Sequence, residues 1–195
     1  MRKNEILEIL KLGAVLCAIT FTVALVLAVA NMSTEGRIAA LDAKAQDEAR
    51  KAVLPSAEVF EAVEVEGVGT GEYKMIDSVF AGKAGDDTVG YSIGVAPTGF
   101  SGAIDMIVGI DSEGKVTGIH IVNHQETPGL GSKALEPQFK DQYHEKSTAN
   151  PLTVIKSGTP KDNEILSISG ATVTSKAITQ GVNAAAKIYH EQLDK

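Results

Sequence analysis

The sequence predicts an α+β domain, in which helices pack on an antiparallel sheet, preceded by one N-terminal transmembrane helix. Three observations carry this prediction. An uncharged apolar run occupies residues 12–32, strand patterns separated by glycine-rich turns begin at Val59, and a helical apolar stripe lies near the C-terminus. Strands followed by helices, rather than alternating with them, are typical of the α+β class.

The first element is the apolar run from Leu12 to Met32. No charged residue occurs between Lys11 and Glu35. A helix needs about 20 apolar residues to cross a bilayer, whereas the apolar region of a signal peptide has about 7–15. We therefore expect residues 12–32 to form a transmembrane helix that stays on the mature protein.

Basic residues on the two sides of this run indicate its orientation. Arg2, Lys3 and Lys11 precede it, and Arg37 and Lys44 are the nearest basic residues after it. The positive-inside rule then makes residues 1–11 a cytoplasmic tail and places the following domain outside the cytoplasm.

Residues 33–58 are predicted to form a helical stalk. They are rich in Ala and charged residues, with apolar residues at helical spacing, and Pro55 is expected to end the helix. The charged face is either solvated, which is the usual case, or a docking surface for a partner subunit.

The globular domain is assigned to residues 59–195. Five strands are expected at residues 59–65, 73–81, 89–96, 103–110 and 116–122. Asp111 to Gly114 is predicted to be a hairpin turn. Glu136 to Tyr143 is predicted to be a short helix with Phe139 and Tyr143 facing inward. A further short strand is expected at residues 152–155, and residues 164–168 are either a short strand or an extended entry to the C-terminal helix. Glycines at 67, 69, 71, 82, 85, 90, 94, 99 and 102 are expected at turns or bulges.

Composition excludes several classes of function. The net charge of −7, the low aromatic content of 5% and the absence of Trp argue against binding to nucleic acid. The single cysteine, Cys17, excludes a disulfide framework and a Cys-ligated cluster within the monomer. The four histidines lack the spacing of a metal site, so no metal is predicted.

A run of small residues opens the C-terminal helix and is the first candidate site. It consists of Ser169, Gly170, Ala171, Thr172, Val173, Thr174 and Ser175. Either Thr174 or Ser175 is expected to be the N-cap of a helix that extends to Leu193. Small side chains, hydroxyl groups and the positive end of a helix dipole suit a phosphate.

A second candidate site lies upstream. It consists of His124, Gln125, Glu126, Thr127, Pro128, Gly129, Leu130 and Gly131. Proline and two glycines allow the backbone to approach a planar ring, and Leu130 offers it apolar contact. Glu126 and Thr127 are candidates to bond the polar groups of such a ligand. His124 is a candidate neighbour, and Lys156 either offsets the ligand's charge or is simply solvated.

Together the two motifs resemble the FMN-binding domain family, over most of the chain from about Val59. In length and layout the chain is most similar to the G subunits of Rnf-type ion-translocating complexes, and next to the C subunits of sodium-pumping NADH:quinone oxidoreductases. The resemblance implies FMN joined through a phosphoester to Thr172, attached after export by a separate flavin transferase. It also implies partner subunits in a membrane complex that couples electron flow between ferredoxin and NAD to Na⁺ or H⁺ movement.

One position departs from the family pattern. Targets of the flavin transferase usually carry Asp three residues before the serine of the motif, and this chain has Leu166 there. Asp162 and Glu164 lie close but out of register. If attachment moved, Thr174 or Ser175 would be the next candidates.

Two functional alternatives to an electron-carrying subunit stay open. One is a tethered sensing or scaffold module without flavin. The other is a secreted flavin reductase-like enzyme whose leader is cleaved near Asn31. Because the chain has no GxGxxG fingerprint, we expect it not to oxidise NADH by itself.

Overall fold

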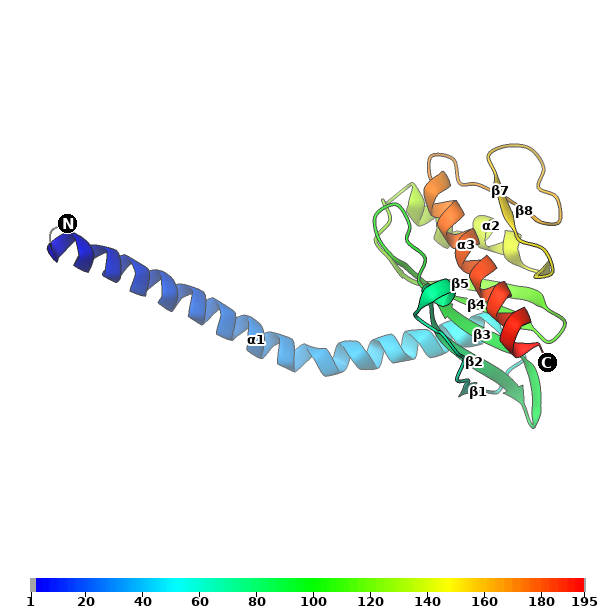
Figure 1. The fold of residues 1–195 in the computed structure, drawn as a ribbon, viewed down its shortest axis with the longest axis horizontal. Coiled ribbons are helices and arrows are strands. Elements are labelled where there is room, and N and C mark those ends of the chain that lie inside the picture. Colours follow the sequence, from blue (N-terminus) through cyan, green and yellow to red (C-terminus); the bar gives the residue numbers. More distant parts are fainter. Residues whose placement is uncertain (1–2, 195) are drawn as a thin grey trace. The chain divides into compact units, whose positions relative to one another are not determined.

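The computed structural model describes the backbone of residues 3–194 and the side chains of residues 8–194. Its contacts divide the chain into two units, residues 1–44 and residues 45–195. Helix α1 (Lys3–Val53) forms the first unit and continues into the second (Figure 1). All strands that the structure describes lie in the second unit.

The apolar part of α1 has the surface of a lipid-facing helix. From Glu8 onward α1 is long and apolar enough to cross a membrane, and none of its apolar window is buried. Large side chains such as Leu12, Phe21 and Met32 are more than half exposed. The helix runs on without interruption through the predicted stalk. The span at residues 12–32 and the stalk at residues 33–58 are predictions from the sequence.

The second unit is built on a six-stranded antiparallel sheet in the order β1-β2-β3-β4-β5-β6, so each strand pairs with its neighbours in the chain. The strands are β1 (Val59–Ala62), β2 (Ile76–Ala84), β3 (Asp87–Val95), β4 (Ile104–Asp111), β5 (Lys115–His124) and β6 (Lys146–Ser147). The α+β prediction is therefore confirmed, and β6 is an additional strand that the sequence did not indicate.

The central strand β4 is buried on both faces. Met106 and Val108 belong to the main core, which helix α3 (Thr172–Ile188) closes from one side with residues such as Ile178. Figure 1 shows α3 crossing this face of the sheet. Ile107 points to the opposite face, where it packs with Leu54 and other residues at the end of α1. This alternation follows from the period of two along a strand.

Glycines allow the end of α1 to approach the sheet closely. A Cβ at Gly109 would lie 2.6 Å from the carbonyl oxygen of Val53, and one at Gly82 would lie 2.8 Å from the Cβ of Ala57. The Thr117 hydroxyl donates to the same Val53 carbonyl. The helix ends at Val53, two residues before Pro55, as the sequence predicts, because proline disfavours helical conformation in the residue before it.

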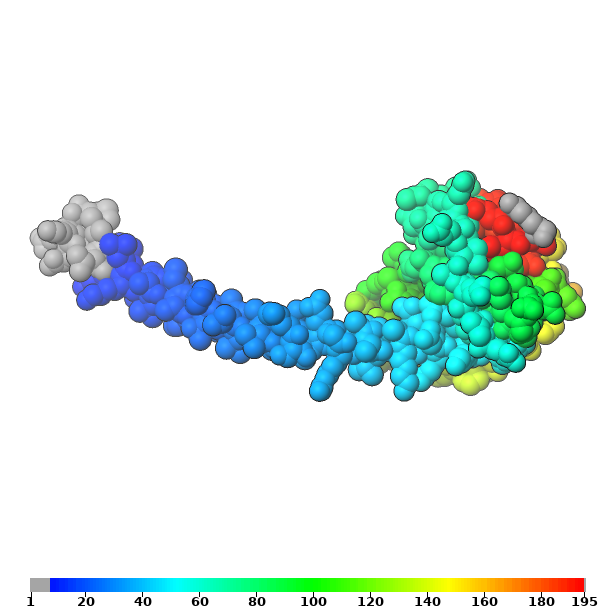
Figure 2. Space-filling model, turned by 90° about the horizontal axis from the view of Figure 1, so that it is seen from below, coloured from blue at the N-terminus to red at the C-terminus, as the bar shows by residue number. Residues whose placement is uncertain are grey.

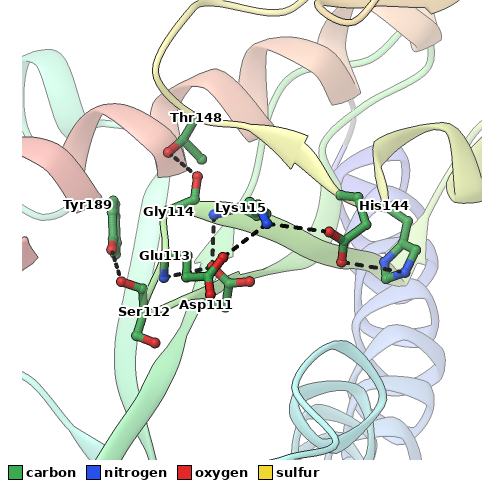
Figure 3. A network of polar contacts seen from close by, with 9 residues as sticks. Asp111, Ser112, Glu113, Gly114, Lys115, His144, Thr148 and Tyr189 are labelled. Carbon is green, nitrogen blue, oxygen red and sulfur yellow. Dashed lines mark hydrogen bonds and ion pairs between the residues drawn. The ribbon is translucent and has the colours of Figure 1, made fainter.

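The predicted turn from Asp111 to Gly114 is confirmed, and Figure 3 shows how it is held. The Asp111 carboxylate accepts hydrogen bonds from the backbone N–H groups of Glu113 and Lys115, both at 2.9 Å. The Thr148 hydroxyl donates to the Gly114 carbonyl at 2.6 Å. The Thr148 bond ties the β4–β5 turn to the segment that follows β6.

The segment between β1 and β2 differs from its prediction. Strand β1 ends at Ala62 rather than at residue 65, and residues 71–73 form the 3₁₀ turn η1 (Gly71–Tyr73) instead of starting β2. Gly67, Gly69 and Gly71 all have positive φ, which interrupts extended backbone. The segment lies against the C-terminal end of the chain (Figure 2), where the Gln192 side chain bonds both the N–H and the carbonyl of Glu66 at 3.1 Å.

A small second layer lies at the end of the sheet that carries the candidate motifs (Figure 1). It contains η2 (Gly131–Leu135), α2 (Pro137–Lys140), η3 (Asp141–Tyr143), β7 (Thr153–Ile155) and β8 (Glu164–Leu166). Phe139 and Tyr143 are buried as predicted. Strands β7 and β8 pair in parallel, which the sequence did not indicate.

The N-cap prediction for the C-terminal helix was wrong. Helix α3 begins at Thr172, and Ala171 precedes it without a side-chain cap. Thr174 and Ser175 lie inside the first turn and are buried. Their hydroxyls bond other groups of the domain and are therefore not N-caps. After Ile188 the helix continues as the π-helical turn η4 (Tyr189–Leu193).

The close contact between α1 and the sheet predicts different effects at two paired glycines. Gly109 pairs with Gly118 across β4 and β5, and a Cβ at Gly118 would meet no atom within 4 Å. We expect Gly109→Ala to lower the free energy of unfolding by about 1–3 kcal/mol, because it overpacks a tight contact. Gly118→Ala should change it far less. Urea unfolding of the full chain in detergent measures both, and equal effects would contradict the proposed contact.

Candidate functional site

The two sequence motifs meet at one cavity of about 330 Å³. One wall comes from the loop between β5 and η2, and another from the turn and first helical turn of α3. A third comes from the loop before β4, which the sequence analysis had not included in the site. The cavity is lined by Phe100, Glu126, Thr127, Leu130, Gly131, Gly170, Ala171, Thr172, Val173 and Thr174.

Thr172 is the first residue of α3 and is partly exposed at this cavity. Within residues 8–194 its hydroxyl has no hydrogen-bond partner. The turn before it contains Gly170 at φ 79°, a conformation that a side chain would strain. Because Ala171 supplies no side-chain cap, the N–H groups that open α3 are left for another acceptor. The beginning of α3 thus combines an open hydroxyl with free N–H donors and a positive dipole end.

Glu126 is a buried charge with three donors from two distant segments. Its Oε1 accepts from the backbone N–H groups of Phe100 at 2.7 Å and Ser101 at 3.1 Å. Its Oε2 accepts from the Thr174 hydroxyl at 2.7 Å. The carboxylate therefore joins the loop before β4 to the first turn of α3. Both of its oxygens accept hydrogen bonds from the protein.

The electrostatic state of Glu126 follows from these contacts. Burial by itself raises the pKa of its carboxyl group, but the bonds from Thr174, Ser101 and Phe100 stabilise the ionised form more. The net result is a pKa below the ordinary value of 4.5. Glu126 is consequently an ionised carboxylate whose charge is stabilised by hydrogen bonds from the domain itself.

Two glycines make room for this carboxylate. A Cβ at Gly99 would overlap Oε1 of Glu126, and a Cβ at Gly131 would overlap Oε2. Gly131 therefore leaves space for the Glu126 carboxylate. Gly129 instead allows the positive φ of 77° that the turn requires.

The rest of the upstream loop is held by hydrogen bonds within the loop. The N–H groups of Leu130 and Ser132 both donate to the Thr127 carbonyl, at 3.2 and 3.3 Å, and the Ser132 hydroxyl accepts from Gly129 N–H at 2.8 Å. The Leu130 side chain is 46% exposed and lines the cavity. The loop thereby presents Leu130 and Thr127 to the cavity, whereas Pro128 is exposed and does not line it.

Several predicted residues lie outside the cavity. His124 ends β5, and its Nδ1 accepts the Glu126 backbone N–H at 3.1 Å, so it braces the loop. Ser175 is fully buried and bonds the Ile168 N–H at 3.0 Å. Lys156 follows β7, is exposed, and does not line the cavity.

Ser169 lines a neighbouring cavity of about 470 Å³, on the other side of the segment that leads into α3. There the Gln142 side chain bonds both the N–H of Leu166, at 2.7 Å, and its carbonyl, at 3.2 Å. Leu166, the position where the family pattern usually has Asp, is thus held through its backbone. This second cavity is lined by Lys133, Glu136, Gln138, Phe139, Gln142, Pro160, Leu166, Ser167, Ile168 and Ser169.

Phe100 is a site residue that neither sequence motif contains, and Val173 lies in the first motif but had no role assigned to it. They are 72% and 52% exposed, respectively, and both line the first cavity. An aromatic residue inside the glycine-rich stretch from Gly99 to Gly102 was the available signal, but that stretch was taken only as a turn.

The arrangement fits FMN. Cavities for such ligands usually hold about 300–1,000 Å³ and combine apolar walls with a few polar groups. Phe100, Leu130 and Val173 offer apolar surface to a ring system, and the start of α3 offers donors to a phosphate. The only carboxylate among the lining residues is already satisfied by the protein, so it does not face a phosphate as a bare charge. Among residues 8–194 no cluster of three potential metal ligands occurs.

Comparison with known proteins agrees with this geometry. Residues 99–187 match the FMN-binding domain family, and this span includes both motifs and Phe100. The chain is 39% identical to the G subunit of the Na⁺-translocating ferredoxin:NAD⁺ oxidoreductase complex of Acetobacterium woodii, over 93% of this chain and 91% of that protein. It is 32% identical to the G subunit of an ion-translocating oxidoreductase complex of Methanosarcina acetivorans, over 91% and 93%.

Solved structures with the same fold are more distant in sequence. NqrC of Shewanella oneidensis matches with a TM-score of 0.57 and 16% identity, over 72% of this chain and 91% of that one. The C subunit of the Na⁺-translocating NADH-quinone reductase of Parabacteroides distasonis matches with a TM-score of 0.56 and 19% identity, over 80% and 98%. These two structures support the fold alone.

The buried Glu126 predicts a pH-dependent loss of stability in Glu126→Gln. An amide cannot accept from both segments, so above the ordinary pKa we expect the free energy of unfolding to fall by about 1.5–3 kcal/mol. Because the folded-state pKa is lowered, the wild-type advantage is fully present above pH 4.5 and is lost as the pH falls below it.

Urea unfolding of the full chain in detergent, at a series of pH values from 7 to 3, measures this difference. Glu136→Gln is the matched control, because Glu136 is exposed and its side chain makes no capping bond. It should change stability by less than about 0.5 kcal/mol. A wild-type advantage that stays constant down to pH 3 would contradict the assignment.

Proposed function

Because the chain belongs to the G-subunit family of ion-translocating ferredoxin:NAD⁺ oxidoreductase complexes and contains an FMN-binding domain, we propose that it carries electrons through FMN within such a complex. The single observation that carries the proposal is Thr172, with its open hydroxyl at the start of α3 and beside the cavity. The complex of the Acetobacterium woodii relative is named for Na⁺, and that of a Clostridium ljungdahlii relative for protons. The coupling is therefore proposed as Na⁺ or H⁺.

The proposal includes a covalent phosphoester between the Thr172 Oγ1 and the FMN phosphate. Thr172 is partly exposed, whereas Thr174 is 1% and Ser175 0% exposed. Both of the latter donate their hydroxyl hydrogens to other groups, namely Glu126 and the Ala171 carbonyl. These differences support Thr172 over Thr174 and Ser175 as the attachment residue.

Attachment requires a separate flavin transferase in this proposal. A threonine hydroxyl is a weak nucleophile unless a base activates it. Within residues 8–194 no side chain is hydrogen-bonded to the Thr172 hydroxyl, so the domain offers no base of its own. The transferase would bring that base and would need access to the exposed start of α3.

The chain's own residues have distinct parts in holding the cofactor. The N–H groups at the start of α3 would bond the phosphate, and Leu130 and Val173 would give apolar contact to the ring. Thr127 offers a hydroxyl at the cavity, while Glu126, contrary to the sequence-based expectation of direct contact, would act through the loops it joins. FMN supplies the electron-accepting and electron-donating chemistry when bound.

The membrane anchor explains how such a carrier would work. A tether keeps a redox group near its partners at a high effective concentration. We propose that residues 12–32 span the membrane once and that the domain from residue 59 lies on the extracytoplasmic side, with other subunits of the complex as partners. The excess of basic residues before the span supports this orientation.

The alternatives have less support. One alternative is that the chain is a C subunit of a sodium-pumping NADH:quinone oxidoreductase. Its support is two structures that share only 16% and 19% identity with this chain. The G-subunit relatives match at 39% and 32% over nearly the whole length, including the α1 region.

Covalent attachment predicts a defined mass change. When the full chain is produced with a flavin transferase and exported, its intact mass should exceed that of the bare chain by one FMN less one water. Thr172→Ala should have the mass of the bare variant and lose flavin fluorescence on a denaturing gel. Thr159→Ala, at an exposed threonine of another loop, should keep both. Flavin retained on Thr172→Ala would contradict the attachment site.

The orientation predicts the labelling of a cysteine placed in the domain. In a Cys17→Ser background, Asp86→Cys provides a single thiol in the exposed turn between β2 and β3. A membrane-impermeant maleimide should label it in intact spheroplasts as fully as in lysed ones. Labelling that appears only after lysis would place the domain in the cytoplasm.

A further inference from the structure

Three of the five large apolar side chains with high exposure in the described part of the second unit line the Thr172 cavity. Among its described residues, the large hydrophobic side chains with high exposure are Val59, Phe100, Leu130, Leu135 and Val173. Phe100, Leu130 and Val173 line the one cavity. Isolated exposed apolar residues are ordinary, but a contiguous apolar group around a cavity indicates a ligand or a partner.

Phe100 stands out in this group. It is 72% exposed, the highest value among the large hydrophobic residues of the second unit. Burying an aromatic side chain removes about 150–250 Å² from water, so leaving one exposed forgoes a large stabilisation. Contact with a bound group would bury this side chain and recover that stabilisation.

The backbone that carries Phe100 is firmly held. Thr98 and Ala103 form a β-bridge, and the Gly99 N–H donates to the Gly102 carbonyl at 2.7 Å. The Phe100 and Ser101 N–H groups donate to Glu126, which in turn accepts from Thr174 on α3. The loop thus has a fixed relation to the helix that begins with Thr172.

We propose that Phe100 is the aromatic contact of the flavin ring and that Glu126 is the positioning residue that holds it beside Thr172. This inference rests on the proposed function and adds to it a ring contact outside both sequence motifs. The chemistry recognised is a planar, weakly polar ring system, for which an aromatic side chain provides matched surface and excludes water. Glu126 acts through the Phe100 backbone and does not itself contact the ring.

The chain offers a direct test, because it contains no Trp. An indole in contact with an excited flavin transfers one electron to it, and the electron returns without net reaction, so the flavin fluorescence is quenched. The experiment compares Phe100→Trp with the wild type as exported full chains loaded by a flavin transferase and purified in detergent. The fluorescence is measured per flavin, with the flavin quantified by absorbance after denaturation.

We expect a several-fold loss of fluorescence in Phe100→Trp. The matched control is Val59→Trp, an exposed residue of β1 that does not line the cavity, and it should keep the wild-type yield. Equal yields in both Trp variants, whether both are quenched or neither is, would overturn the proposal. Wild-type protein without flavin would instead overturn the proposed function, so the two failures are distinguishable.

A second variant removes the ring contact. In Phe100→Ala, iodide should quench the flavin fluorescence more strongly than in the wild type, because water and iodide then reach the ring. Unchanged iodide quenching would overturn the proposal, including when Phe100→Trp accepts no flavin.

The positioning role of Glu126 has its own readout. Adding Glu126→Ala to Phe100→Trp should restore part of the lost fluorescence, because no side chain at position 126 then joins the loop to α3. Loss of stability alone would not change the quenching of the folded protein. Quenching as strong in the double variant as in Phe100→Trp would overturn the role assigned to Glu126.

Discussion

The site depends on one buried carboxylate. Glu126 would be costly in the interior without partners, because a buried charge must be compensated by hydrogen bonds. Its three donors come from residues 25, 26 and 48 positions away in the chain. These hydrogen bonds therefore join three segments: the loop before β4, the loop after β5 and the first turn of α3. Gly99 and Gly131 are part of the same constraint, since side chains there would occupy the space of the carboxylate.

Close backbone packing sets the second constraint, on the opposite face of the sheet. The last turn of α1 contacts β4 and β5 through Gly109 and the Thr117 hydroxyl, and Leu54 lies fully buried against Gly82. The helix that leaves the apolar segment thus ends inside a core of the domain. The other face carries α3, whose first residue is Thr172. The sheet separates the attachment of the anchor from the candidate cofactor site.

At three places in the domain a side-chain amide bonds both backbone groups of a single distant residue. Asn183 bonds both the N–H and the carbonyl of Leu152, at 2.8 and 2.9 Å. Gln142 bonds both the N–H and the carbonyl of Leu166, and Gln192 bonds both the N–H and the carbonyl of Glu66. Each amide satisfies both the N–H and the carbonyl of one residue. The Gln142 contact holds Leu166, which lies in the segment that leads into α3.

The sequence by itself determined the long apolar segment of α1, the approximate positions of most strands, the β4–β5 turn and the two motifs, because each depends on residues adjacent in the chain. Tertiary structure alone decided that Phe100 joins the site, that Glu126 bonds protein groups, and that Thr174 and Ser175 are buried rather than capping α3. The parallel pair β7–β8 and the absence of Lys156 from the cavity were decided in the same way. The physical reason is that these features depend on hydrogen bonds and packing between distant segments, which leave no periodic pattern in the sequence.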